Sequence, residues 1–258
     1  MMDFNERLIP GISSNFLYQE ALARYLFAFT LLDKNAKILD MGCGTGYGAK
    51  VLAPRGKFIG VDVNNEAIDF ARKNYGNYGE FYVGNVENMT FKAMSFDAIC
   101  SFEVMEHLKS SRKYLQEASR VLVGKGVFIM STPNKDFTKA VGAVDSQYHI
   151  NEYGYEELVT MLEKYFSKVK IYGQSKSKKA QDAFLTFLDS QDTRQSLVNF
   201  DLLGLRRFFP RNFKEKVWGF LGMLFGAKKQ RELNVGDFPI TNDSVESAEY
   251  FVAVCQKK

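Results

Sequence analysis

The chain has 258 residues, 46% of them apolar and 25% charged, and can bury one large core or a core with an insertion. Its three cysteines, Cys43, Cys100 and Cys255, lie too far apart for a disulfide framework and favour a reducing cytoplasm. Asp3 and Glu6 interrupt the N-terminus, so we expect no signal peptide. No uncharged apolar stretch approaches the ~20 residues that a membrane-spanning helix needs.

Helical and strand patterns alternate along the chain, which favours a parallel sheet covered by helices. Seven strands are expected in this α/β fold, in a mostly parallel sheet with helices on both faces. The expected elements, in chain order, are a helix at 16–32, a strand at 36–40, a helix at 46–53, a strand at 57–61, a helix at 64–74, strands at 80–84 and 96–101, a helix at 110–122, a strand at 126–131, a helix at 154–165, and strands at 168–172 and 250–255.

These elements predict four parts of the chain. Residues 1–33 form an N-terminal cap helix, 34–172 a core, 173–237 an insertion, and 238–258 the final strand that completes the core. The insertion lacks the alternating pattern and is far longer than an ordinary connection of about 4–6 residues. We therefore expect a helical segment over or beside the ligand site.

Positive charge is concentrated inside this insertion. Residues 204–231 contain eight bases and one acid, a net charge of +7, whereas the remaining 26 bases and 29 acids give −3. The bases flank an apolar run at 217–227. One interpretation is an interfacial helix that touches anionic lipid or a lipid-linked substrate. The interpretation that we favour is a helix whose apolar side covers a substrate cleft while its lysines stay in water. Nucleic acid is not expected, because no aromatic series is interleaved with the bases.

A glycine-rich loop follows the first expected strand. The strand ends at Asp40, and glycines then occupy alternate positions at Gly42, Gly44 and Gly46. Glycine lets the backbone adopt positive φ and lets a ligand approach without a Cβ in the way. A helix that begins near Gly46 directs its N-terminus at the same ligand. The loop predicts a cradle for a nucleotide-like cofactor.

The surrounding residues disfavour a dinucleotide. The dinucleotide pattern requires a small residue where this chain has Tyr47, and no base lies in the loop to bind a pyrophosphate. Asp40 would repel such a group. Asp62 ends the second strand 20 residues after Gly42, where its carboxylate can accept hydrogen bonds from both ribose hydroxyls. The two acids suit a cationic nucleoside without phosphate.

With these motifs, the chain resembles the class I S-adenosylmethionine-dependent methyltransferases. Segments 81–89, 95–108 and 120–129 are similar to later strands of that family, although Asn85 replaces its more frequent Asp. The resemblance implies a Rossmann-like fold and S-adenosylmethionine as methyl donor. The cofactor-binding residues that the loop and the resemblance indicate are Asp40, Gly42, Cys43, Gly44, Gly46, Asp62, Val63, Asn85, Val86 and Phe102, with Tyr18 and Arg24 over the cofactor carboxylate.

Two histidines are the candidates for a catalytic base. An oxygen acceptor must lose a proton, and His107 and His149 are the only histidines of the chain. His107 ends a Glu-x-x-Glu-His segment after the fourth strand. Its alternative role is to orient the next helix together with Glu106, and the alternative for His149 is a loop residue packed against Tyr153.

Metal dependence is a further alternative, which we do not favour. Glu-x-x-Glu-His is similar to a magnesium site in the polyprenyl-benzoate methyltransferases of ubiquinone synthesis, which would carry over to Glu103, Glu106 and His107. Hard oxygen ligands suit magnesium, but histidine does not especially. We expect no metal ligands.

Segments along nearly the whole chain are similar to bacterial and archaeal methyltransferases found with surface-polysaccharide synthesis: 6–11, 24–28, 131–134 and 149–153. The resemblance implies transfer of a methyl group to a small-molecule or glycan acceptor, at a hydroxyl of a sugar, glycan or quinone-like compound. The alternatives are a non-catalytic, cofactor-binding or membrane-associated scaffold and, less favoured, an NAD-dependent oxidoreductase. We expect a cytoplasmic protein, with peripheral membrane contact through 204–231 as the open variant.

Overall fold

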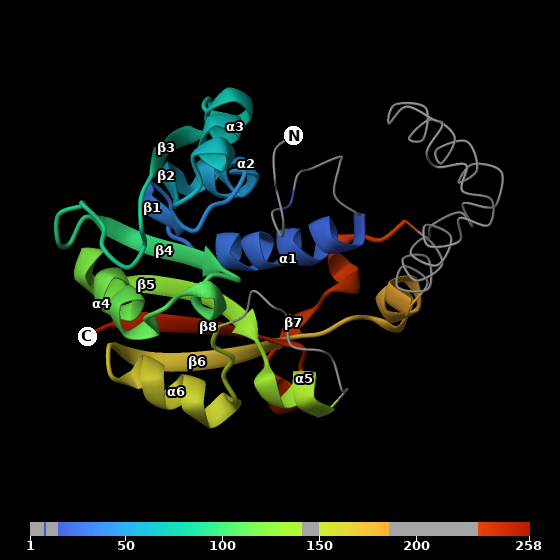
Figure 1. The fold of residues 1–258 in the computed structure, drawn as a ribbon. Coiled ribbons are helices and arrows are strands. Elements are labelled where there is room, and N and C mark those ends of the chain that lie inside the picture. The colour runs from blue at the N-terminus through green and yellow to red at the C-terminus, as the bar shows by residue number, and fades with distance from the viewer. Residues whose placement is uncertain (1–7, 9–14, 141–149, 186–231) are drawn as a thin grey trace, which may run out of the picture.

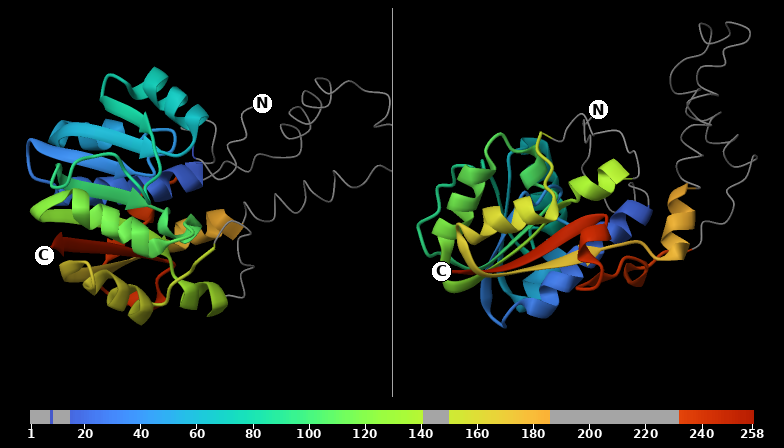
Figure 2. Two further views of the ribbon diagram at one scale, coloured as in Figure 1. Left: turned by 60° about the vertical axis from the view of Figure 1, so that its left-hand side comes forward. Right: turned by 90° about the horizontal axis from the view of Figure 1, so that it is seen from below.

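One eight-stranded sheet organises the molecule, with helices on both of its faces (Figures 1 and 2). The computed structural model describes residue 8 and residues 15–140, 150–185 and 232–258. The strand order is β3-β2-β1-β4-β5-β8-β6-β7. The strands are β1 (Ala36–Met41), β2 (Gly56–Asp62), β3 (Gly79–Val83), β4 (Phe96–Phe102), β5 (Leu122–Pro133), β6 (Phe166–Gln174), β7 (Ile240–Thr241) and β8 (Tyr250–Lys257).

Helices connect most of these strands. Side-chain caps set where two of them begin: Asn64 Oδ1 accepts from the Ala67 amide at 2.8 Å, and Ser110 Oγ accepts from the Lys113 amide at 3.3 Å. The helices are α1 (Asn15–Leu31), α2 (Ala49–Leu52), α3 (Asn65–Tyr75), α4 (Ser111–Val121), α5 (Lys135–Ala140) and α6 (Tyr155–Glu163), with 3₁₀ turns η1 (Ala53–Arg55), η2 (Met105–His107), η4 (Val235–Asp237) and η5 (Val245–Ser247).

The strand order reverses beside β1. β1 pairs in parallel with β2 on one side and with β4 on the other, so β2 and β3 extend the sheet in one direction and β4 and β5 extend it in the other. A crevice opens at the carboxyl ends of parallel strands where the order reverses, and open α/β sheets bind ligands there. β8 runs antiparallel between β5 and β6.

The two faces of the sheet carry separate apolar cores. Adjacent residues of one strand point to opposite faces, so Ile38 packs with α1, α2 and α3, whereas Leu39 packs under α4 and α6. The second core contains Leu115 of α4 and Leu158 of α6, both fully buried. Burial on both faces explains why the central strands are almost continuously apolar.

The predicted mostly parallel α/β sheet is confirmed, with small differences. The eighth strand is β7, whose two residues pair with the end of β6 and are too short to produce a sequence pattern. The helix expected at 46–53 begins only at Ala49, because Gly46 and Gly48 belong to the preceding turn. Helix α5 was not predicted from the sequence.

The predicted insertion, 173–237, is described at its two ends, residues 173–185 and 232–237, and both ends pack on α1. Phe16 of α1 stacks on Phe184 with a centroid distance of 5.3 Å and meets the edge of Phe238 at 5.2 Å. Ala180 and Leu233 complete this cluster. Residues 204–231, the basic segment, lie outside the described residues. No helix in the described part of the chain combines the length and apolar character needed to cross a bilayer.

Asn134 ties β5 to the segment before β8. Its Nδ2 donates to the carbonyl oxygens of Glu246 and Ala248 at 2.9 and 2.8 Å, and the residue is fully buried. We expect Asn134→Ala to lower the free energy of unfolding by about 2–4 kcal/mol, because buried carbonyls lose their donor. Urea denaturation measures this. Asn74→Ala, which removes an exposed bond within α3, is the control, and an equal loss in both variants would contradict the assignment.

Candidate functional site

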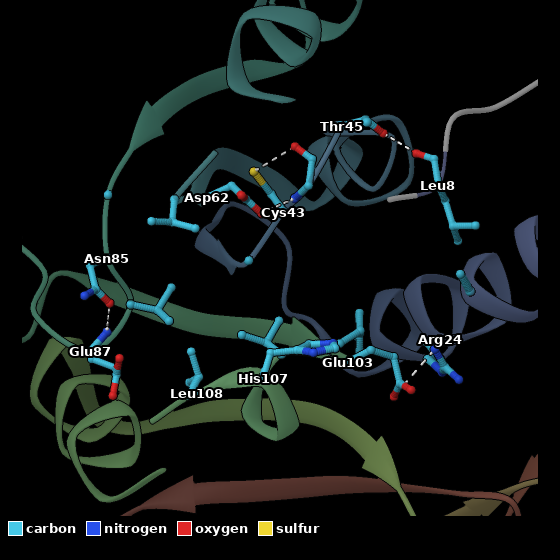
Figure 3. A pocket seen from close by; sticks show the side chains of 18 of the residues that line it. Leu8, Arg24, Cys43, Thr45, Asp62, Asn85, Glu87, Glu103, His107 and Leu108 are labelled. Carbon is cyan, nitrogen blue, oxygen red and sulfur yellow. Dashed lines mark hydrogen bonds and ion pairs between the residues drawn. The ribbon is translucent and has the colours of Figure 1, made fainter. Parts of the chain in front are cut away.

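A cavity of about 880 Å³ opens at the carboxyl ends of β1, β2 and β4 (Figure 3). Its walls come from the loops after β1, β2, β3 and β4, with α1 along one side. The lining residues are Leu8, Ala21, Arg24, Tyr25, Gly42, Cys43, Gly44, Thr45, Tyr47, Asp62, Val63, Gly84, Asn85, Val86, Glu87, Phe102, Glu103, Val104, His107, Leu108, Lys109 and Ile150.

The structure favours glycine at the three loop positions for different reasons. All have positive φ, at 81° for Gly42, 52° for Gly44 and 80° for Gly46. A Cβ on Gly42 would lie 2.4 Å from Val104 Cγ2, and one on Gly46 would lie 2.7 Å from Ala71 Cβ. A Cβ on Gly44 would meet nothing within 4 Å. Only Gly44 therefore leaves open space for a ligand, and Gly46 does not line the cavity.

Asp62 holds the loop and also lines the cavity. Its Oδ2 accepts from the Gly44 amide and its Oδ1 from the Asn64 amide, both at 2.9 Å. The amides of Gly42 and Cys43 donate to the Val61 carbonyl at 2.7 and 3.0 Å. These loop amides are thus engaged within the protein. Next to Asp62, Val63 is 67% exposed at the cavity.

The loop after β3 supplies a polar wall. Asn85 Oδ1 accepts from the Glu87 amide at 2.8 Å, and the Glu87 carboxylate accepts from the Ser110 amide at 2.8 Å. The side-chain oxygen of Asn85, a residue that the resemblance indicates for cofactor binding, already has this backbone donor. Val86 is buried and lines the cavity beside it.

Arg24 of α1 reaches the cavity from below the loop. Its Nε donates to Gln174 Oε1 at 2.6 Å, and its Nη1 lies 3.6 Å from Glu103 Oε1. Its Nη2 is buried without a hydrogen-bond partner among the described residues. Tyr18, also on α1, does not line the cavity but packs edge-on against Tyr47 at 5.8 Å.

Asp40 lies beneath the loop, outside the lining. The Tyr25 hydroxyl donates to its Oδ2 at 3.0 Å, whereas Oδ1 has no hydrogen-bond partner in the described part of the chain. Burial raises the pKa of Asp40 to about 7, against the opposing effect of the Tyr25 hydrogen bond. Phe102 lines the cavity and meets the Tyr25 ring edge-on at 4.9 Å.

The segment after β4 forms the wall opposite Cys43 and Asp62 (Figure 3). His107 sits on the 3₁₀ turn η2, with Nε2 3.9 Å from Glu106 Oε1. Glu106 is fully buried, and desolvation raises the pKa of its carboxyl well above its usual range. Glu103 instead accepts a hydrogen bond from Ser131 Oγ at 2.6 Å.

The structure describes one of the two histidines that the sequence predicts as catalytic bases. His107 lines the cavity, whereas His149 lies outside the described residues. Among the residues that the structure describes, no three His, Cys, Asp or Glu side chains are grouped to hold a metal ion.

Sequence reasoning did not assign several lining residues to the site. Leu8 is an example: its carbonyl oxygen accepts from Thr45 Oγ1 at 2.5 Å, across 37 positions of sequence. Tyr47 and Glu103 stand inside recognisable motifs and were detectable there. No local pattern indicates Leu8 or Ile150, because tertiary contacts alone bring them to the cavity.

Comparison with known proteins identifies relatives of this chain in sequence and in fold. A family model described as a methyltransferase domain matches residues 32–192, more than half of the chain. A probable S-adenosylmethionine-dependent methyltransferase of Mycobacterium tuberculosis is 32% identical over 127 residues, 48% of this chain and 46% of that protein. A ubiquinone biosynthesis O-methyltransferase of Coxiella burnetii is 29% identical over 109 residues, 40% of this chain and 46% of that protein.

The fold is shared with solved structures at lower identity. A SAM-dependent methyltransferase from Thermotoga maritima has a TM-score of 0.58 and 19% identity, over 94% of this chain and 92% of that chain. At this identity the likeness concerns the fold alone. The chain spans about half the length of these two curated relatives.

The glycine contacts predict unequal effects of adding a methyl group. Gly46→Ala should lower the free energy of unfolding by about 2–4 kcal/mol, from left-handed backbone strain and from overlap with Ala71 and Phe81. Gly44→Ala carries only the backbone strain, about 1 kcal/mol. Urea denaturation of both variants measures the difference. Equal losses would show that the loop does not have this packing.

The raised pKa of Asp40 predicts a pH effect on stability. The folded state binds this proton up to about pH 7, whereas an unfolded Asp loses it near pH 4, so the stabilisation present below pH 4 is lost as pH rises to 7. Asp40→Asn has no such proton. Its stability relative to the unsubstituted protein should rise by at least about 1 kcal/mol from pH 4 to pH 8. Chemical denaturation at a series of pH values checks this. Asp69→Asn, at an exposed position, is the control, and its stability relative to the unsubstituted protein should not depend on pH.

Proposed function

The chain belongs to the methyltransferase domain family, and from this premise we propose that it transfers a methyl group from S-adenosylmethionine to a hydroxyl oxygen of a small-molecule or glycan acceptor. The observation that carries the proposal is the pairing of Gly44 with Asp62 at the reversal of strand order. Gly44 leaves open space and Asp62 presents a carboxylate to the same cavity. This combination suits a ribose placed against the loop.

The residues around the cavity fit the remaining parts of this cofactor. Asn85 and Val86 line the cavity after β3 and suit the adenine, and Phe102 and Cys43, which also line it, suit the methionine part. One guanidinium nitrogen of Arg24, Nη2, has no hydrogen-bond partner among the described residues and suits the cofactor carboxylate. When bound, S-adenosylmethionine supplies an electrophilic methyl group on a sulfonium.

The hydrogen bonds of the loop favour this cofactor over a dinucleotide. Pyrophosphate binding uses the amides of such a loop. Here the Gly42 and Cys43 amides donate to Val61, the Gly44 amide to Asp62, and the Gly46 amide to the Cys43 carbonyl at 3.0 Å. The nearby carboxylates would repel phosphate and attract a cation. A nicotinamide-dependent oxidoreductase is correspondingly disfavoured.

In the proposed mechanism, the chain aligns the acceptor and removes its proton. His107 lies on the cavity wall, where its imidazole can take the proton of an acceptor hydroxyl. Glu106 is buried beside it, with Oε1 3.9 Å from His107 Nε2. His149 stays a prediction as an additional base. Collinear placement of acceptor oxygen, methyl carbon and sulfur supplies much of the acceleration.

An oxygen acceptor is supported by the Coxiella relative, whose name describes an O-methyltransferase of ubiquinone biosynthesis. The cavity is also lined by the apolar side chains of Leu8, Leu108 and Ile150 and by Lys109. Those apolar side chains suit the ring or carbon skeleton of a small molecule or glycan. Peripheral membrane contact through 204–231, in a cytoplasmic protein, stays a prediction.

Calorimetric titration with S-adenosylhomocysteine and with NAD tests the cofactor. We expect binding of the former and none of the latter; preference for NAD would overturn the proposal. Incubation with a labelled methyl donor and fractionated native extracts then tests transfer and identifies the acceptor. A protein that binds the cofactor but labels no fraction would be a non-catalytic scaffold.

The fraction that accepts the label also tests His107. His107→Ala should leave the affinity for S-adenosylhomocysteine unchanged and lower the transfer rate at least about a hundredfold. Unchanged transfer would exclude His107 as the base and leave alignment of the reacting atoms as the mechanism.

Asp62→Asn tests the ribose contact while keeping an oxygen near the Gly44 amide. We expect the affinity for S-adenosylhomocysteine to fall by about 1–3 kcal/mol, because charged hydrogen bonds to the ribose are lost. Calorimetric titration measures this change. Asp69→Asn, on the exposed side of α3, should bind as the unsubstituted protein does. Unchanged affinity in Asp62→Asn would show that the ribose lies elsewhere.

A further inference from the structure

A lysine is buried where the insertion leaves the sheet. Lys176 follows the end of β6, and only 7% of its side chain is exposed. Its Nζ lies 3.2 Å from Glu20 Oε1 on α1 and contacts the Glu249 carboxylate beside β8. Three rings surround the ammonium group, with centroids 5.2–5.6 Å away: Phe16, Phe184 and Tyr250.

This cluster adjoins the cavity wall through Arg24. Arg24 follows Glu20 by one helical turn, and the Tyr250 ring lies between the two cations, 4.4 Å from the Arg24 guanidinium and 5.6 Å from Lys176 Nζ. Gln174 ties both helix positions, because its Nε2 donates to the Glu20 carbonyl at 2.9 Å and its Oε1 accepts from Arg24 Nε. On its other side Arg24 faces Glu103 at 3.6 Å.

The charges in this cluster place Arg24 between two acids. Its guanidinium group is attracted to the Glu103 carboxylate at the cavity and to the Glu20 carboxylate on its own helix. Both Arg24 and Glu20 are buried, so these attractions are weakly screened. Lys176 compensates the negative charge of Glu20, so that Arg24 stays paired with Glu103. Without Lys176, the uncompensated Glu20 carboxylate would take Arg24 as its nearest cation, since residues four apart share one helix face.

We propose that Lys176 is a positioning residue, which holds Arg24 at the cavity by neutralising Glu20. The inference rests on the proposed function, in which Arg24 receives the cofactor carboxylate. Phe184 belongs to the predicted insertion, and its ring packs on Phe16 of α1. Because Lys176 also contacts Phe184, it links the packing of residues 173–185 on α1 to this carboxylate site.

Two ligands separate this role from a general effect on the fold. S-adenosylhomocysteine carries the carboxylate, whereas 5′-methylthioadenosine has the same thioether nucleoside without it. Lys176→Met should weaken S-adenosylhomocysteine at least about fivefold in calorimetric titration and change 5′-methylthioadenosine less than twofold. Lys179→Met is the matched control, because it removes a 3.2 Å pair with Asp237 at the same base and should change neither affinity.

Double variants keep the test decisive if Lys176→Met alone folds poorly. Lys176→Met with Glu20→Gln removes the competitor for Arg24 and should restore S-adenosylhomocysteine affinity to within about threefold. Lys176→Met with Glu249→Gln has the same net charge but leaves Glu20 uncompensated, and should stay weak. Equal affinities in the two double variants, or equal losses for both ligands in Lys176→Met, would overturn the inference. If the unsubstituted protein bound neither ligand, the proposed function would fail as well.

Discussion

The parallel pairing of β1 with β2 is the constraint on which the site depends. It places the carboxyl ends of both strands at one edge of the sheet, so that Asp62 can accept from the Gly44 amide 18 residues earlier. That hydrogen bond holds the loop open at Gly44 while Gly42 and Gly46 pack closely against Val104 and Ala71. A ligand cavity follows because β4 pairs in parallel with the other edge of β1, so that the strand order reverses at this point.

Charge at this edge is arranged by segments far apart in sequence. The strands on either side of the loop supply two acids, Asp40 and Asp62. A buried cation of the cavity wall, Arg24, comes from α1 and contacts Gln174 of β6 and Glu103 after β4. Buried charges cost less when they are paired and hydrogen-bonded, so Arg24, Glu20 and Lys176 stabilise one another as a group. The site and the base of the insertion therefore share one electrostatic network.

Particular residues show how far local patterns reach. The apolar runs that became β1, β2 and β4 were evident because strands buried on both faces are continuously apolar, and glycines at positive φ mark the loop between them. Asp62 and His107 stand next to such strand ends, so their positions in the sequence indicated this edge of the sheet, and the family resemblance indicated Asn85. Asp40 and Tyr18 do not line the cavity, and spacing cannot tell a residue beneath a loop from one that faces a ligand.

The sequence by itself determined the α/β class, the seven longer strands along the chain and the glycine loop after the first of them, since each depends on short-range periodicity or spacing, and the resemblance of several segments indicated the family. Tertiary structure alone decided which glycine leaves room for a ligand, that Asp40 pairs with Tyr25, and that Lys176 approaches Glu20 across more than 150 positions. The physical reason is that burial and charge pairing depend on distances in space, which no periodicity along the chain encodes.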